Sequence, residues 1–220
     1  MDPAIEIETG EAPKASVVVL HGLGADGGDF VPIAEELDLA AVGPVRFVFP
    51  HAPMRPVTVN GGYVMRAWYD ILGFGGTSRE DEAGLRASRE AVDLLIAREV
   101  ERGVPAARIV VAGFSQGCAM ALMTGMRHGE RLAGIAGLSG YLPLADATAA
   151  ERADANRDTP IFLAHGVDDP VVSLARGRAS RDRLQALGCT LDWHEYPIEH
   201  TVSLDEVRDL EHWLLARLAL

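Results

Sequence analysis

The fold is indicated by residues 108–123, which read RIVVAGFSQGCAMALM. Apart from Arg108, residues 108–114 are apolar and rich in β-branched side chains, as in a buried strand, and residues 118–123 continue as a helix. Between them, residues 113–117 match G-x-S-x-G, in which a serine stands on a sharp turn from a strand into a helix. A glycine-rich turn with an incidental serine is the alternative, but the flanking strand and helix favour a nucleophile. Ser115 is therefore predicted to present its hydroxyl at the carboxyl edge of a sheet, above the positive end of a helix.

Short apolar runs and longer helical periods alternate along the rest of the chain. Helices are predicted over residues 80–102 and 174–187, and after Ser203, where Glu206 three residues later completes a capping pattern. Continuously apolar strands separated by helices imply a mostly parallel sheet with helices on both faces, and ligands bind beyond the carboxyl ends of such strands. The other predicted strands are 16–20, 45–49, 132–139, 160–164 and 190–196, with a short edge strand at 5–7.

Length and composition limit the class of protein. The chain has 220 residues, so a single domain over residues 1–220 is expected, and 48% hydrophobic residues exclude a disordered chain. A net charge of −12 argues against nucleic acids and anionic membranes as partners. Two cysteines cannot form a disulfide framework, and the acidic N-terminal residues do not resemble a secretory signal. No run reaches the roughly 18 apolar residues of a membrane span, so a cytoplasmic protein without stable membrane insertion is expected.

A serine nucleophile needs a base, and in this architecture an acid and then a histidine follow the serine along the chain. Asp168 and Asp169 follow the strand before the last one, and the residues alone leave the choice between them open. Of the seven histidines, His200 follows the last strand and precedes the last helix, so it is favoured as the base. His21 and His165 each end a strand and precede a glycine, and they are expected to hold loops in shape.

An acyl-transfer site also needs N–H donors for the oxyanion. One is expected to be the backbone N–H of Gln116, the residue after the nucleophile. The other is expected from the loop at residues 21–28, HGLGADGG, where adjacent glycines allow the Leu23 N–H to turn inward. A plain glycine-rich turn is the alternative. The long connection at residues 50–79 is too apolar for a disordered loop and is a candidate wall of an apolar pocket.

Several segments together resemble one family. They are LHGLGADG at residues 20–27, FPHAP at 49–53, AWYD at 67–70, GFSQG at 113–117 and HGVDDPVV at 165–172. The resemblance is to the α/β-hydrolase branch of small carboxylesterases, acyl-protein thioesterases and lysophospholipases, and it covers nearly the whole chain. It implies the α/β-hydrolase fold without a large cap domain, and it implies no metal and no organic cofactor.

The resemblance also implies roles for particular residues. In the family's H-G-x-x-D-P pattern the acid precedes the proline, which makes Asp169 the partner of His200, with Ser115 as the nucleophile. The oxyanion donors fall on Leu23 and Gln116. The arrangement is then a Ser-His-Asp triad, in which the acid orients the imidazole and stabilises its charged form.

The long loop is implied to line the acyl groove, with Trp68, Leu72 and Phe74 as substrate contacts. Aromatic residues in an apolar loop are alternatively part of the core. Two positions depart from the family's pattern: Ser173 stands where proline is common, and Glu199 stands directly before the base. A carboxylate beside a histidine can raise its pKa or distort its loop.

Together these features predict a serine hydrolase that cleaves carboxylic esters of small to medium acyl chains through an acyl-enzyme intermediate. The alternative is an acyl-protein thioesterase or lysophospholipase that acts on long acyl chains. A non-catalytic ligand-binding module on the same fold is a remote third hypothesis. The expected partner is a small-molecule ester or acyl thioester, and the resemblance adds a homodimer, which members of this family often form.

Overall fold

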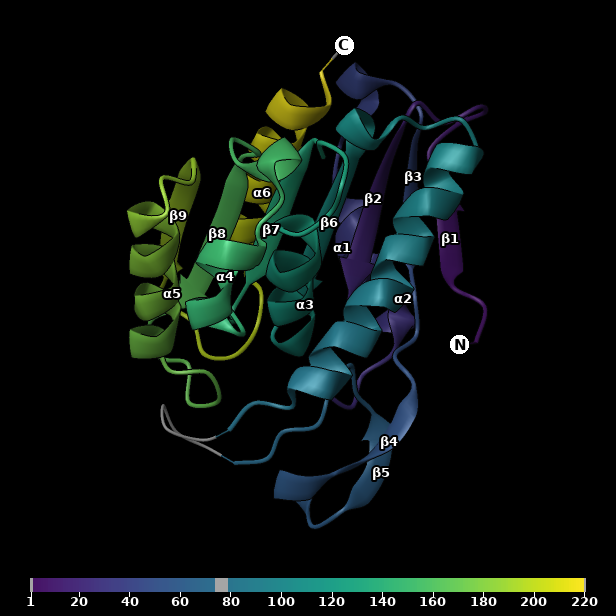
Figure 1. Ribbon diagram of the computed structural model, residues 1–220. Helices are drawn as coiled ribbons and strands as arrows, with labels where there is room; N and C mark the ends of the chain where they lie inside the picture. Colours follow the sequence, from purple (N-terminus) through teal and green to yellow (C-terminus); the bar gives the residue numbers. More distant parts are fainter. Residues whose placement is uncertain (1, 74–78, 220) are drawn as a thin grey trace.

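Seven strands form one sheet in the computed structural model, which describes residues 2–73 and 79–219 of the chain (Figure 1). The strand order is β1-β3-β2-β6-β7-β8-β9, and every neighbouring pair is parallel except β1 with β3. All seven strands were expected from the sequence, within two residues at most ends. Their bounds are β1 Ile5–Glu8, β2 Ala15–Leu20, β3 Val45–Phe49, β6 Ile109–Phe114, β7 Gly134–Leu138, β8 Ile161–Gly166 and β9 Leu191–Tyr196.

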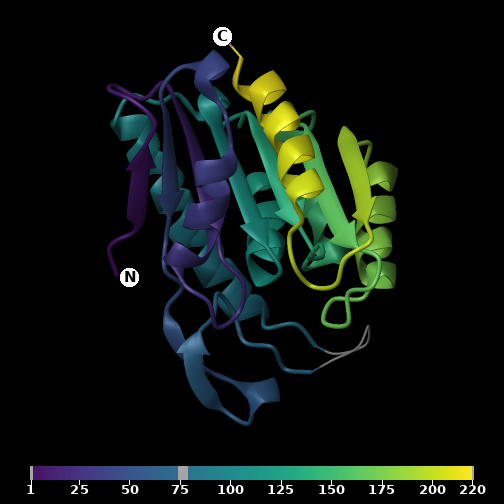
Figure 2. The same ribbon diagram turned by 180° about the vertical axis from the view of Figure 1, so that it is seen from behind.

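Helices cover both faces of this sheet. Helices α2, α3, α4 and α5 lie on the near face in Figure 1, and α1 and α6 lie on the face seen in Figure 2. The sequence pattern does not predict α4, because seven residues are too few to show a helical period. None of the helices in the described ranges is long and apolar enough to cross a bilayer. The bounds are α1 Val31–Glu36, α2 Glu82–Glu101, α3 Gln116–Gly125, α4 Ala145–Glu151, α5 Leu174–Ala186 and α6 Leu204–Leu218.

Two apolar clusters fill the space between the sheet and the helices. On one face, Leu85 and Ile96 of α2 pack in a cluster with most of α3, all of whose residues are buried. On the other face, Trp213 of α6 packs in a cluster with Phe47 and Phe162 of the sheet. The complete burial of α3 explains why its sequence is almost entirely apolar. It also holds the first turn of α3, and therefore the residue before it, in one position.

The long connection after β3 contains a hairpin rather than a continuous pocket wall. Strands β4 (Met54–Val57) and β5 (Tyr63–Arg66) pair in antiparallel fashion and extend beyond the main sheet (Figure 1). Several apolar side chains of the hairpin are exposed, among them Tyr63 at 69%. After β5 the chain returns to the core at residues 67–69, which are buried. The expected wall of an apolar pocket is therefore divided into an exposed hairpin and a buried segment.

Helix α6 begins as the capping pattern predicts, because the hydroxyl of Ser203 accepts the N–H of Glu206 at 3.2 Å. The side chain of Glu206 is fully buried. Burial raises the pKa of this carboxyl to about 8, since the charged form loses its hydration. Glu206 therefore keeps its proton at neutral pH in the folded protein.

The substitution Glu206→Gln is expected to stabilise the protein increasingly as the pH rises. An unfolded glutamate ionises near 4.5 and the folded one near 8, so between these values the folded state binds the extra proton. The wild-type free energy of unfolding therefore falls as pH rises through this window, whereas a glutamine does not titrate. Urea unfolding at pH 5 and pH 8 should show the variant gaining about 3.5 kcal/mol over the wild type between the two conditions. A difference that does not change with pH would contradict the prediction.

Candidate active site

Ser115 stands on the turn between β6 and α3. Its backbone has a φ of 55° and a ψ of −115°, a strained conformation for a residue with a side chain. The chain passes so closely here that a Cβ on Gly117 would lie 1.9 Å from the carbonyl oxygen of Leu20. A Cβ on Gly113 would lie 2.2 Å from the carbonyl oxygen of Gly117. Both glycines of the G-x-S-x-G pattern are therefore required by backbone contact.

The substitution Gly117→Ala is expected to destabilise the protein by about 3 kcal/mol or more, because the methyl group collides with backbone that the sheet holds in place. Gly129→Ala is the matched control, since a Cβ at Gly129 would meet nothing within 4 Å. The control should remain within about 0.5 kcal/mol of the wild type. Urea unfolding of the two variants measures the difference, and equal stabilities would contradict the close approach at the turn.

His200 contacts both Ser115 and an aspartate. Its Nε2 lies 2.9 Å from Ser115 Oγ, and its Nδ1 lies 2.6 Å from Asp169 Oδ2. Because a carboxylate only accepts hydrogen bonds, Nδ1 carries the proton and Nε2 is free to accept the serine hydroxyl. Asp169 is buried, whereas Asp168 is exposed. The structure thus brings Ser115, Asp169 and His200 together at the carboxyl ends of β6, β8 and β9.

The turn after β8 fixes the orientation of the Asp169 carboxylate. Its Oδ1 accepts the backbone N–H groups of Val171 and Val172, each at 2.8 Å, which leaves Oδ2 to face the imidazole. Ser173, which replaces the proline common in the family, has a φ of −57°, the value that proline would impose. Glu199, the other departure, is exposed. Neither departure prevents the contact between His200 and Asp169.

Of the two expected oxyanion donors, Gln116 directly follows Ser115, and the loop that carries Leu23 approaches Ser115 at Gly22, where a Cβ would lie 3.4 Å from the Ser115 Cβ. Leu23 lies in the loop after β2, and Gln116 is the first residue of α3. The side chain of Gln116 accepts the backbone N–H of Trp68 and donates to the carbonyl of Tyr69, both at 2.8 Å. The indole of Trp68 in turn donates to the carbonyl of His21 at 2.9 Å. These bonds tie the loop that carries Leu23 to the turn that carries the nucleophile.

Two histidines hold loops in shape, as the sequence predicts. His21 Nε2 accepts the N–H of Ala52 at 3.0 Å, and burial lowers the pKa of this imidazole, which keeps it neutral. His165 Nε2 lies 2.7 Å from the carbonyl oxygen of Val172, in the same turn that orients Asp169. The imidazole that contacts Ser115 Oγ is that of His200, so these two rings do not compete with it.

The three expected substrate contacts have different outcomes. The prediction for Trp68 is wrong, because its side chain is fully buried and belongs to the apolar core. Leu72 is 42% exposed and borders a small cavity beside Tyr69 and Tyr141. Phe74 lies outside the described residues. Leu72 thus remains a predicted contact.

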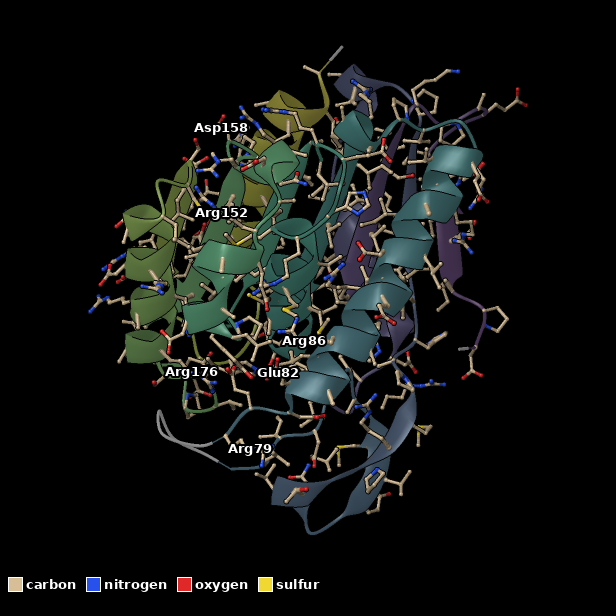
Figure 3. All side chains as sticks on the ribbon, in the orientation of Figure 1. Arg79, Glu82, Arg86, Arg152, Asp158 and Arg176 are labelled. Atoms are coloured by element: carbon tan, nitrogen blue, oxygen red, sulfur yellow. The ribbon has the colours of Figure 1, made fainter. Side chains whose placement is uncertain are left out.

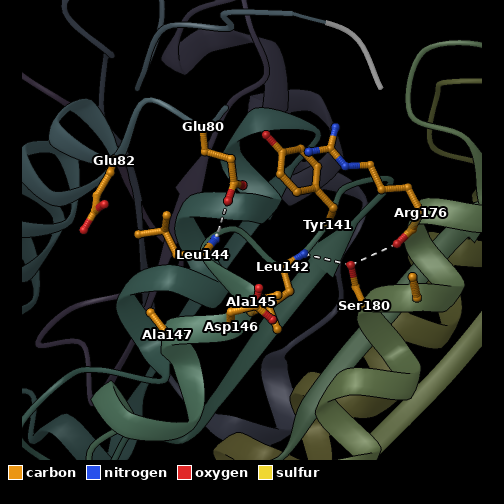
Figure 4. A pocket seen from close by; sticks show the side chains of 11 residues that line it. Glu80, Glu82, Tyr141, Leu142, Leu144, Ala145, Asp146, Ala147, Arg176 and Ser180 are labelled. Carbon is orange, nitrogen blue, oxygen red and sulfur yellow. Dashed lines mark hydrogen bonds between the residues drawn. The ribbon is translucent and has the colours of Figure 1, made fainter. Parts of the chain in front are cut away.

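Two grooves lie near the site. The larger one, of about 490 Å³, runs between α4, α5 and the residues before α2 (Figure 4). In it the guanidinium of Arg176 lies 3.3 Å from the ring centroid of Tyr141, and Glu80 accepts the N–H of Leu144 at 2.9 Å. Figure 3 shows Arg79 and Arg176 at the same end of the molecule.

The smaller groove, of about 260 Å³, is lined by His200 itself. Within residues 2–73 and 79–219, no group of three His, Cys, Asp or Glu side chains is arranged to hold a metal ion.

A mostly parallel sheet with a serine on a strand-to-helix turn, in contact with a histidine, places the protein among the α/β-hydrolases. Residues 2–217 match the family model described as Phospholipase/Carboxylesterase. The chain therefore belongs to this family of hydrolases, and the expected fold without a large cap domain is confirmed.

Relatives and solved structures agree with this assignment. The chain is 41% identical over 217 residues to acyl-protein thioesterase 1 of Yarrowia lipolytica, covering 96% of each chain. It is 39% identical to acyl-protein thioesterase 1 of Neurospora crassa, covering 93% of this chain and 87% of that one. The crystal structure of Zea mays acyl-protein thioesterase 2 superposes with a TM-score of 0.85 at 30% identity, covering 98% and 99% of the two chains. SOBER1 of Arabidopsis thaliana also has a TM-score of 0.85 and 30% identity, with coverages of 93% and 99%.

Proposed function

We propose that the protein is an acyl-protein thioesterase that uses Ser115 as its nucleophile. The observation that carries this proposal is the position of His200, with Nε2 2.9 Å from Ser115 Oγ and Nδ1 2.6 Å from Asp169 Oδ2. Relatives at 33–41% identity are acyl-protein thioesterases. They favour the long-chain thioester hypothesis over the expected carboxylesterase for small to medium esters.

The first half of the reaction forms the acyl-enzyme. His200 Nε2 takes the hydroxyl proton of Ser115 as Oγ attacks the thioester carbonyl, and Asp169 stabilises the resulting imidazolium. The backbone N–H groups of Leu23 and Gln116 stabilise the oxyanion, with support from the positive end of α3. The imidazolium then gives its proton to the sulfur as the carbon–sulfur bond breaks, and the thiol leaves.

The second half regenerates the enzyme. A water molecule gives a proton to His200 Nε2 and attacks the acyl carbonyl, and the same two N–H groups stabilise the second oxyanion. When the carbon–oxygen bond to Ser115 breaks, the imidazolium returns its proton to Oγ and the carboxylic acid is released. Because the same residues serve both halves, loss of either the base or its orientation stops the whole cycle.

A series of matched thioesters and oxyesters tests this substrate class. With acetyl, butyryl, octanoyl and palmitoyl groups on one leaving group, kcat/KM for the thioesters should rise by about tenfold or more from acetyl to octanoyl, because each buried methylene adds binding energy. A maximum at acetyl or butyryl would instead support the small-ester carboxylesterase. No turnover of any compound would contradict both hypotheses and favour the ligand-binding module.

A further inference from the structure

A groove lies directly beside the imidazole of His200. Its volume is about 260 Å³, and its lining residues come from residues 29–33, from the end of β6 and from the loop before α6. Helices α1 and α6 cover the same face of the sheet (Figure 2). The ring of Phe114 connects it to the site, with its centroid 4.7 Å from that of His200 and 5.6 Å from that of Phe30. The groove is lined by Asp29, Phe30, Ile33, Phe114, His200, Thr201 and Val202.

The proposed reaction determines which part of a substrate would enter this groove. The leaving sulfur receives its proton from His200 Nε2, so it must lie against the imidazole when the bond breaks. The groove is lined by the same imidazole, so it is the nearest space for the group attached to that sulfur. The larger groove of Figure 4 lies on the opposite face of the sheet, and none of its lining residues is Ser115, Asp169 or His200.

The lining is mixed: four of its seven residues are apolar, and the other three are Asp29, His200 and Thr201. Phe30, Ile33, Phe114 and Val202 form the walls, and the exposed Asp29 is the one carboxylate among the lining residues. The whole chain carries a net charge of −12, so a strongly anionic leaving group is repelled by the protein field. A leaving group with an apolar side chain and a positive charge matches both the walls and Asp29.

We propose that this groove selects the leaving thiol, and that it favours an S-acylated cysteine peptide with one apolar and one basic neighbour. The proposal rests on the thioesterase function proposed above and names its substrate class. Ile33 recognises the apolar neighbour through contact between the two side chains. Asp29 recognises the basic neighbour through attraction between opposite charges.

Four S-octanoyl peptides of equal length test the proposal, with leucine or serine on one side of the cysteine and lysine or glutamate on the other. In the wild type, kcat/KM should be about tenfold higher for leucine than for serine, the difference that one apolar group makes in an apolar pocket. It should be about two- to fivefold higher for lysine than for glutamate, as for exposed charge pairs, and this second preference should weaken at high salt.

Substitutions separate the two contributions. Ile33→Asn should remove the leucine preference and keep the lysine preference, whereas Asp29→Asn should do the reverse. Leu94→Asn and Asp192→Asn are matched controls, because both residues are exposed and lie outside the groove. If Ile33→Asn does not fold, Val202→Thr replaces it, with the same expected loss of the leucine preference.

The outcomes distinguish the two proposals. Equal rates for all four peptides, or preferences that survive both groove substitutions, would overturn the groove proposal and leave the thioesterase function standing. If none of the four peptides is hydrolysed, the result would contradict the thioesterase function itself, and the groove proposal with it. Separate loss of the two preferences in the two groove variants, with both controls unchanged, would support the assignment.

Discussion

Replacing Ser115 with alanine is expected to reduce kcat for thioester hydrolysis by about a million-fold, as the loss of the nucleophile does in other serine hydrolases. The fold should remain, because the strained turn depends on Gly113 and Gly117 and not on the serine hydroxyl, which forms its hydrogen bond with His200. Turnover of an octanoyl thioester measures the loss, and circular dichroism checks that the variant is folded.

Covalent trapping identifies the nucleophile independently of turnover. An organophosphonate should label the wild type once, and peptide mapping should place the label on Ser115. Ser173→Ala is the matched control, since Ser173 is exposed and its side chain makes no cap hydrogen bond to α5. This control should react like the wild type. A label on Cys118 would overturn the mechanism; burial raises the pKa of that thiol to about 12, which keeps it protonated and unreactive.

The positions of Ser115, Asp169 and His200 could be predicted because each lies in the connection that follows a strand of a parallel sheet. The carboxyl ends of parallel strands lie at one edge, so side chains far apart in the chain are brought to one place. The glycines around Ser115 add a steric requirement that is visible as a pattern. Backbone topology thus determines the position of most of the site. The alternation of apolar runs and helical periods in the sequence predicts that topology.

The choice between Asp168 and Asp169 could not be made from spacing, because it depends on how the turn after β8 folds. The structure shows that the N–H groups of Val171 and Val172 both reach Asp169 Oδ1, and a contact of this kind leaves no signal in composition. Trp68 was misassigned for a similar reason. An aromatic residue in a loop looks the same whether its indole faces a substrate or, as here, the carbonyl of His21.

The hairpin of β4 and β5 also escaped prediction. Each strand is four residues long, and Pro56 lies within the first, where proline normally argues against a strand. It is tolerated because this hairpin is a separate two-stranded sheet with free edges. Short strands of this kind are placed by tertiary contacts rather than by a local pattern.

Asp169→Asn is expected to reduce kcat by about ten-thousand-fold, as an aspartate-to-asparagine change does in serine proteases. The two N–H groups on Oδ1 require an acceptor there, so the asparagine carbonyl must take that position and its NH₂ must face His200 Nδ1. The imidazole is then forced to carry its proton on Nε2, where it cannot accept the hydroxyl of Ser115. Asp168→Asn makes the same chemical change on the neighbouring, exposed carboxylate and should alter kcat less than about twofold. Similar losses in the two variants would show that the carboxylates act through the general field, whereas a loss confined to Asp169→Asn would show that the tautomer of His200 controls the reaction.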